Sequence, residues 1–382
     1  GFYRFWLATN IRRHLWSNSS AGGDALEYTG TARELLIGFL FALAILVPIY
    51  LVYFVIGVEA ERWKAFAGVP LGLFYYGFAQ FAVYRARRYR LTRTLWRGVR
   101  FWMTGSGTAY ALRALGWTFL TVLTLGLAYP WRAAALERYK IGHTFYGDLP
   151  GRFESQGWDF FKSGWWLWLL ALVPLAAYVG SLAVAVISAA PTKAHVPSTP
   201  LEARVAASGA GLLLLVIVSF LILPFIYATF KAIEWKWWAE GLRFGHGPGD
   251  VSFDSNLRRG TLIGNTWKMI GLSAAVSIAS GALAGVVDYG VMTALGIDTI
   301  KIAAGHSSPA TALAIPAAVV SLATFVALGV VWRIYMVQRI WKLVASSIEV
   351  ENLGAAEHVS AKGEAVSALG EGLADGLDVA GF

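Results

Sequence analysis

The chain has 382 residues, of which 57% are apolar and only 14% are charged, whereas about 25% of residues are charged in typical soluble domains. Lysine and arginine outnumber aspartate and glutamate by 32 to 23, which gives a formal net charge of +9. Cysteine is absent, which excludes disulfides, thiolate metal sites and a cysteine nucleophile. This composition predicts an integral membrane protein. Because the basic residues lie between apolar runs, we expect them to contact membrane lipids rather than nucleic acid.

Six apolar runs are long enough to cross a bilayer, for which about 20 residues are needed. They are residues 35–57, 66–84, 164–190, 208–230, 262–288 and 312–337. The connectors 58–65, 191–204 and 289–311 together contain only five lysines or arginines. The positive-inside rule therefore places the connectors outside and the basic segments in the cytoplasm. The six runs then form three hairpins that leave and return to the same side.

A seventh apolar run, residues 107–130, has basic segments at both ends, so it cannot cross once and obey the same rule. We expect a re-entrant or interfacial helix pair with a break near Gly116 or Gly126. A single crossing that violates the rule is the alternative. Arg113 lies in this run, and a broken helix around a charge is typical of transporter and channel sites. Arg113 is therefore the candidate functional residue, although its side chain can also extend to the interface.

The segment from Tyr3 to Gly30 recurs along the chain. Two copies are displaced by 75 and 125 residues, and weaker copies lie at 227–255 and 332–352. Each copy is a basic, aromatic-rich helix, then a small polar residue and a glycine, then a short alternating stretch that predicts a strand. We expect the strands to pair into a small cytoplasmic sheet; independent amphipathic loops on the headgroups are the alternative. The basic residues of these copies that we expect to contact lipid headgroups are Arg87, Arg88, Arg93, Arg138 and Lys140.

These patterns predict an all-α polytopic membrane protein with three transmembrane hairpins, a re-entrant segment and small cytoplasmic helix–turn–strand repeats. Its expected parts are a first membrane half (1–160, with hairpin 35–84 and re-entrant segment 107–130), a second half (161–350, with hairpins 164–230 and 262–337) and an acidic tail (351–382). The tail carries leucines at helical spacing, so it either docks on the basic copies or remains disordered.

A stripe of small residues marks one helix of the third hairpin. It consists of Ser273, Ser277, Gly281 and Gly285, which repeat every four residues. Small residues in this rhythm permit two helices to approach closely. The sequence leaves open whether the second helix belongs to this chain or to another copy in a homo-oligomer.

No motif with catalytic or cofactor chemistry stands out. The six histidines are scattered singly, so neither their spacing nor a cysteine supports a metal site. The glycine-rich stretch 245–249 lacks the lysine and hydroxyl residue of a phosphate-binding loop, and the chain has no Gly-x-Ser-x-Gly nucleophile elbow at Gly105-Ser106-Gly107. We therefore expect a protein that is not an enzyme, with no catalytic residues, no metal and no cofactor.

Several motifs resemble one known family. They are residues 124–131 (TLGLAYPW), 136–140 (LERYK), 143–148 (HTFYGD), 89–98 (YRLTRTLWRG) and 12–17 (RRHLWS). They resemble the YjgN-like bacterial inner-membrane proteins, a domain family of unknown function, over essentially the whole chain. The resemblance implies a multi-pass inner-membrane location and a further apolar segment before Gly1, and it supplies no catalytic residues. Because members of that family are often encoded beside a membrane zinc metallopeptidase, it also implies such a protease as a candidate partner.

The expected function is therefore non-enzymatic. The spans contain almost no carboxylates, which disfavours an ion-coupled carrier and leaves a passive pore, a transporter-like protein or a lipid-handling protein. The alternative is a membrane scaffold or adaptor for a partner such as the metallopeptidase.

Overall fold

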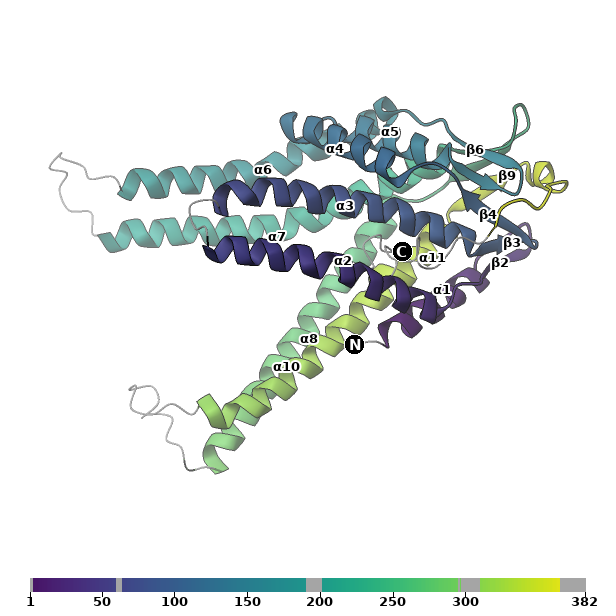
Figure 1. The fold of residues 1–382 in the computed structure, drawn as a ribbon. Helices are drawn as coiled ribbons and strands as arrows, with labels where there is room; N and C mark the ends of the chain where they lie inside the picture. The colour runs from purple at the N-terminus through teal and green to yellow at the C-terminus, as the bar shows by residue number, and fades with distance from the viewer. Residues whose placement is uncertain (1–2, 60–63, 190–200, 295, 297–309, 365–382) are drawn as a thin grey trace.

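The computed structural model describes residues 3–59, 64–189, 201–294, 296 and 310–364. Long helices extend from one end of the molecule, and short strands gather at the other (Figure 1). The helices are α1 (Arg4–Ser17), α2 (Ala32–Glu59), α3 (Lys64–Thr92), α4 (Gly107–Leu123), α5 (Tyr129–Ile141), α6 (Gly157–Ala189), α7 (Leu201–Glu240), α8 (Arg259–Ala294), α10 (Ala310–Trp332), the π-helix η2 (Arg333–Arg339), α11 (Ile340–Ala345) and the 3-10 helix η3 (Leu353–Ala356).

The described strands form one antiparallel sheet of nine, in which each strand pairs with its neighbours in sequence. They are β1 (Ser20–Ala21), β2 (Asp24–Tyr28), β3 (Thr94–Trp96), β4 (Val99–Met103), β5 (Thr144–Tyr146), β6 (Leu149–Phe153), β7 (Leu242–Phe244), β8 (Val251–Ser255) and β9 (Ile348–Glu351). The pairing of Gly151 with Phe244 continues the sheet across the boundary expected near residue 160. The two expected membrane halves therefore share one sheet.

The sequence repeat has a structural counterpart, because α1, α3, α5, α7 and α11 each lead directly into a strand or hairpin of the sheet. In three copies a hydroxyl at the same position caps the helix end. Ser19 donates to the carbonyl of Leu15, and Thr94 and Thr144 donate to carbonyls four residues earlier, at 2.8–2.9 Å. Such bonds satisfy carbonyls that the end of a helix leaves unpaired. The predicted helix–turn–strand units and their pairing are confirmed.

The turns between the paired strands explain the glycines of the repeat. Gly22 and Gly23 both have positive φ, and so do Arg97 and Gly98 in the next copy. Positive φ at both central residues defines the type I′ turn, whose twist matches that of a two-stranded antiparallel hairpin. Glycine adopts this conformation without the steric cost that a Cβ brings.

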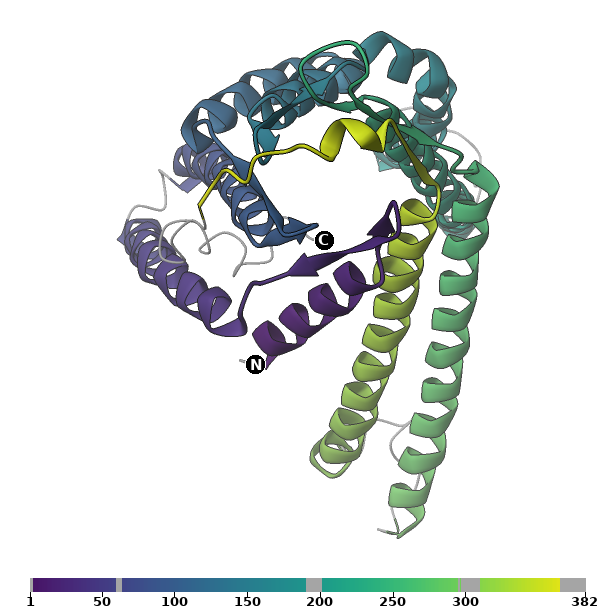
Figure 2. The ribbon, with the colours of Figure 1, turned by 90° about the vertical axis from the view of Figure 1, so that its right-hand side faces the viewer.

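Viewed from the strand end, the sheet curls into a nearly closed ring, which we call the β-ring (Figure 2). β1 and β9 are the two ends of the strand order, and contacts between side chains bridge them. The indole of Trp341 donates to the Ser19 hydroxyl at 2.9 Å and stacks on Trp16, with 4.9 Å between ring centroids. The first and last copies of the repeat are thereby joined.

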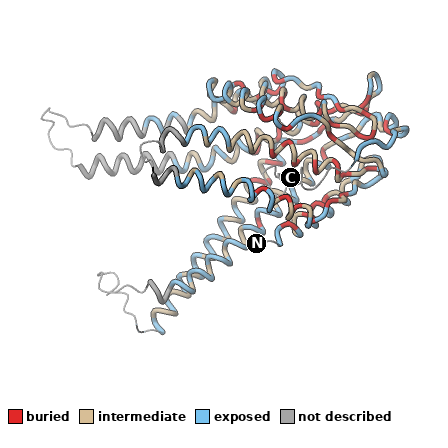
Figure 3. The backbone as a smooth tube through the Cα atoms, viewed as in Figure 1, coloured by how far each residue is buried: buried red, intermediate tan, exposed pale blue. Residues whose placement is uncertain are grey.

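Five helical segments in the described residues are long and apolar enough to cross a membrane. They are Ala32–Val55, Gly157–Gly180, Val216–Glu240, Arg259–Ala294 and Ala314–Ala345. Each overlaps one of the six expected spans. The remaining expected span, 66–84, is helical in α3 but is not among the five; glycines, tyrosines and Gln80 interrupt its apolar residues. Side chains along the extended helices are largely exposed, and buried ones gather near the β-ring (Figure 3).

The protein is mostly helical, but the expected all-α class is wrong. Each strand is short, yet the strands of all five repeats pair into one nine-stranded sheet. The seventh apolar run is broken into α4 and α5 where Leu125 and Gly126 adopt positive φ. The break therefore lies at Gly126, whereas Gly116 lies inside α4.

Candidate ligand-binding site

Equivalent residues of four repeats meet at the centre of the molecule. Arg87, Glu137, Trp235 and Trp341 each stand seven positions before the first residue of β3, β5, β7 and β9, respectively. All four line one cavity of about 750 Å³, which we call the chamber. Each of these helices leads into a strand of the β-ring, so the helical turn at the same distance before the strand faces the same centre in each repeat. The volume lies within the 300–1,000 Å³ that is usual for ligand pockets.

The chamber wall contains two carboxylates, and each has its own lysine. Glu137 pairs with Lys140 on α5 and accepts a hydrogen bond from the Trp238 indole at 3.1 Å. Burial alone would raise the pKa of Glu137, but the charges of Lys140 and Arg87 outweigh it and hold that pKa below its usual range. Glu137 is therefore ionised at neutral pH.

The second carboxylate belongs to α7. Glu234 pairs with Lys231 at 2.6 Å and accepts a hydrogen bond from the hydroxyl of Tyr129 at 2.6 Å. An ionised carboxylate can only accept hydrogen bonds, so the tyrosine hydroxyl is the donor. The pair connects α5 to α7 on one side of the chamber.

Arg87 is the charged residue without such a match. It makes no ion pair or hydrogen bond with any residue that the structure describes, and its Nε is buried without a hydrogen-bond partner. It lines the chamber and also a second cavity of about 290 Å³, which we call the lumen. Trp238 likewise lines both cavities, so the chamber and the lumen adjoin at these two side chains.

The lumen lies inside the β-ring. Apart from Arg87 and Thr144, it is lined by apolar and aromatic side chains: Ala21, Leu26, Leu91, Trp96, Phe101, Ile141, Tyr146, Leu149, Trp238, Leu242, Phe244, Val251, Phe253, Val350, Leu353 and Ala356. Strands bury alternate side chains on one face, and in this ring the inward face is the apolar one. A cavity of this kind excludes water and accepts hydrocarbon.

The chain after β9 covers the lumen at the strand end. Leu353 and Ala356 line it, and the following segment crosses the ring (Figure 2). There Asp148 accepts hydrogen bonds from the backbone N–H and the hydroxyl of Ser360, both at 3.0 Å. We call residues 353–364 the strap. The leucine-bearing part of the tail that was expected to dock on the basic copies lies outside the described residues, which end at residue 364.

A π-helix forms another wall of the chamber. η2 contributes Met336 and Val337, and α11 follows it with Trp341. π-helical turns are rare and are frequent at functional sites. The wider π-helical turns of η2 rotate the side chains that follow relative to those that precede. The side chains of α11 can therefore face the chamber while those of α10 face the membrane.

The predicted functional residue Arg113 lies elsewhere. It is exposed on α4, and its guanidinium carbon stands 4.3 Å from the centroid of the Tyr139 ring. It lines neither the chamber nor the lumen. A role for Arg113 remains a prediction.

The five basic residues predicted to contact headgroups differ in their surroundings. Arg87 lines the chamber, Lys140 pairs with Glu137 of the chamber wall, and Arg93 pairs with Glu34 at 2.8 Å. Arg88 is half-buried, and only Arg138 is exposed, with a weak bond to the Ser155 carbonyl at 3.5 Å. Headgroup contact stays a prediction for all five.

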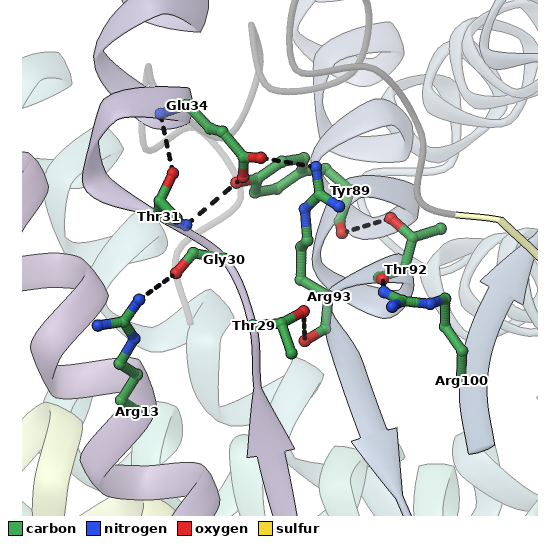
Figure 4. A network of polar contacts seen from close by, with 9 residues as sticks. All are labelled: Arg13, Thr29, Gly30, Thr31, Glu34, Tyr89, Thr92, Arg93 and Arg100. Atoms are coloured by element: carbon green, nitrogen blue, oxygen red, sulfur yellow. Dashed lines mark hydrogen bonds and ion pairs between the residues drawn. The ribbon is translucent and has the colours of Figure 1, made fainter. Parts of the chain in front are cut away.

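Figure 4 shows why Arg93 is held in place. Thr31 and Glu34 form a capping box at the start of α2, with reciprocal bonds of 3.4 Å. The same carboxylate accepts hydrogen bonds from the fully buried Tyr89 at 2.5 Å and from Arg93 at 2.8 Å, while Arg13 donates to the Gly30 carbonyl at 3.0 Å. This network, the Glu34 network, fastens α2 and the first repeat to α3.

The small-residue stripe does not face the other helix of its hairpin. α8 packs against α10, yet Ser277, Gly281 and Gly285 are exposed and only Ser273 is partly covered. A Cβ added at Gly281 or Gly285 would meet no atom within 4 Å. The stripe is thus open to a helix outside the described part of this chain.

Glu137, Glu234 and Trp238 were not among the residues predicted from the sequence. A signal was present, because shifting Arg12 by 75 and 125 residues gives Arg87 and Glu137, so a carboxylate replaces arginine at an equivalent position. Spacing of Lys231 and Glu234 by three on one helix also predicts their pairing. In the described ranges, no three His, Asp or Glu side chains stand close enough to hold a metal ion together.

These observations define a multi-pass membrane protein in which helical spans continue into a ring of strands that encloses an apolar lumen. A family model matches residues 1–376, and its description is "Bacterial protein of unknown function (DUF898)". The chain belongs to this bacterial family. No curated protein and no solved structure matches the chain.

Proposed function

We propose that this protein handles lipid without chemically altering it, by holding the apolar part of an amphiphile in the lumen. The observation that supports the proposal is the junction at Arg87 and Trp238. There the apolar lumen of about 290 Å³ adjoins the larger chamber, which contains charged and indole groups. A site that is apolar at one end and polar at the other suits an amphiphile, because each part of the molecule finds a matching surface.

The same features favour a holding site over a passive pore. Water-filled membrane channels are lined by polar residues, whereas the lumen is lined almost entirely by apolar ones. The strap residues Leu353 and Ala356 also cover the lumen at the strand end. An apolar and covered lumen can retain a hydrocarbon chain more readily than it can pass an ion.

The proposed orientation places the β-ring in the cytoplasm of the bacterium and the helices in its inner membrane. α4 and α5 then form a re-entrant hairpin, because α4 starts after β4 and α5 ends before β5, both at the ring. α4 has 17 residues, fewer than a full crossing needs. Strongly exposed apolar side chains lie at its far end and in the turn that follows, namely Phe119, Val122, Leu123 and Leu125.

Single cysteines test this orientation directly, because the chain has none of its own. Exposed Glu27 and Arg138 belong to different repeats, so Glu27→Cys and Arg138→Cys should both react with an impermeant maleimide from the cytoplasmic side only. Lys193→Cys, in an expected outer connector, should react from the opposite side. Labelling of Glu27→Cys and Arg138→Cys from opposite sides would contradict the arrangement.

Lipid retention tests the function. Protein purified in mild detergent should carry bound lipid, detectable as added mass by native mass spectrometry. Ala356→Trp fills the lumen and should reduce the lipid-bound fraction severalfold, whereas Ala355→Trp, at the exposed neighbouring position, should not. Lipid-free wild-type protein, or equal retention by both variants, would contradict the proposal.

A scaffold for another membrane protein, such as a membrane metallopeptidase, is the second candidate. The exposed stripe at Ser277, Gly281 and Gly285 favours it, because small residues admit a close helix partner. That partner could also be a second copy of this chain. Gly281→Leu should release a partner that crosslinks to α8 in native membranes, and Leu283→Ala is a control at another exposed position of the helix. A crosslinking pattern unchanged by Gly281→Leu would contradict this second reading.

A further inference from the structure

We propose that the amphiphile is anionic and that Arg87 binds its phosphate or carboxylate head in the chamber. This inference rests on the proposed function and specifies the chemical class of the ligand. The juxtaposition that supports it is one unmatched guanidinium at the mouth of an apolar lumen.

The charges around the chamber do not balance. Lys140 neutralises Glu137, and Lys231 neutralises Glu234, each through a direct ion pair. Glu137 is close enough to attract Arg87 as well, but no carboxylate in the described residues forms an ion pair with Arg87. Among these described groups, Arg87 is therefore the charge without an ion-pair partner.

The guanidinium of Arg87 is partly buried. Its Nε is covered and has no hydrogen-bond partner among the residues that the structure describes, whereas its two terminal nitrogens are not among the buried unpaired atoms of those residues. The adjoining chamber of about 750 Å³ has room for an anionic group beside it. An anion bound there would give the Arg87 guanidinium an ion-pair partner.

Arginine suits this task better than lysine. Its planar guanidinium forms two parallel hydrogen bonds with a carboxylate or phosphate, and such charge-assisted bonds are among the strongest in proteins. Arg87 also lines the lumen, so a head group at Arg87 leaves the attached hydrocarbon next to the apolar cavity.

Competition between two lipids tests the inference. Delipidated full-length protein is offered equal amounts of phosphatidylglycerol and of diacylglycerol, which has matched acyl chains but no anionic group, and the bound lipids are counted by native mass spectrometry. Wild-type protein should retain phosphatidylglycerol in roughly tenfold excess or more, as expected for a charge-assisted hydrogen bond. Arg87→Gln should bring the ratio close to one, and Arg138→Gln, which removes an exposed arginine, should leave it unchanged.

Each other outcome has a meaning. Equal retention of both lipids by wild-type protein would overturn the inference while leaving lipid handling intact, whereas retention of neither would overturn both. A preference that survives in Arg87→Gln would also overturn it. Displacement of phosphatidylglycerol by an equal concentration of inorganic phosphate would assign the site to a free anion instead of an amphiphile.

Arg87→Gln could fail to fold because the residue is partly buried. Arg87→Lys then decides the question, because it keeps the charge but loses the paired hydrogen bonds. A reduced preference for phosphatidylglycerol in Arg87→Lys supports the role of Arg87, and an unchanged preference opposes it.

Discussion

Removal of the Glu34 carboxylate should destabilise the contact between the first two repeats. In Glu34→Ala, the fully buried Tyr89 hydroxyl loses the Glu34 carboxylate as acceptor, and Arg93, whose side chain is only 11% exposed, loses its ion pair with Glu34. Each hydrogen bond to a charged group contributes about 1.5–3 kcal/mol. Glu34 itself is 26% exposed, so water can replace part of what is lost. We expect a net loss of about 2–4 kcal/mol.

The measurement is thermal unfolding in detergent, followed by the emission of the tryptophans. Glu34→Ala should melt several degrees below wild type, and Glu34→Gln should fall between them because its amide oxygen still accepts a hydrogen bond. Glu27→Ala, which removes an exposed carboxylate from the same repeat, should melt like wild type.

A double-mutant cycle isolates the ion pair. If Glu34 and Arg93 act together, the loss in Glu34→Ala/Arg93→Ala should be smaller than the sum of the two single losses by about 1 kcal/mol or more. Strict additivity, or a Glu34→Ala protein that melts like Glu27→Ala, would refute the assignment of this network as a fastening between α2 and α3.

Three further outcomes follow from local geometry. Gly105→Ala should destabilise the protein by about 2 kcal/mol or more in the same melting assay, because Gly105 has φ +81° and a Cβ there would lie 2.4 Å from the Tyr84 hydroxyl. Because the pKa of Glu137 is lowered on folding, its contribution to stability is present above the ordinary glutamate pKa of 4.5 and is lost as pH falls below that value. Glu137→Gln should therefore weaken the loss of stability at acid pH. An acid dependence equal to that of wild type would contradict this role of Glu137. Asp148→Ala removes both bonds from Ser360 and should speed proteolysis of the strap, whereas a cleavage rate equal to that of wild type would show that these bonds do not hold it.

Local signals allowed much of the architecture to be predicted. The apolar runs gave the helices of the hairpins, because about 20 residues without charge are needed to cross hydrocarbon. The repeat gave the strands and their turns, because hydroxyls such as Thr94 and Thr144 and glycines such as Gly98 determine where a helix ends and a hairpin turns. A break near Gly116 or Gly126 was predicted for the seventh apolar run, and the structure places it at Gly126, which has positive φ.

The site was less accessible to prediction. Arg113 was predicted because a charge within an apolar run is unusual. Arg87 and Glu137 lie in stretches with several charged residues, so the local sequence does not distinguish them from their neighbours. Headgroup contact is the natural expectation for Arg87 when only its neighbours in sequence are known. Its position at the chamber depends on helices from other repeats, which the periodicity of one segment does not specify.

The sequence by itself determined that the chain is a membrane protein with repeated helix–strand units, since composition, run length and capping residues act locally. Only the tertiary structure decided that the units form a nearly closed ring, that the Trp341 indole meets Ser19 across 322 residues, and that Arg87 lies beside an apolar lumen with no ion-pair partner among the described residues. The physical reason is that cavities and charge balance arise from side chains that converge through space, and their convergence depends on how every repeat packs against the next.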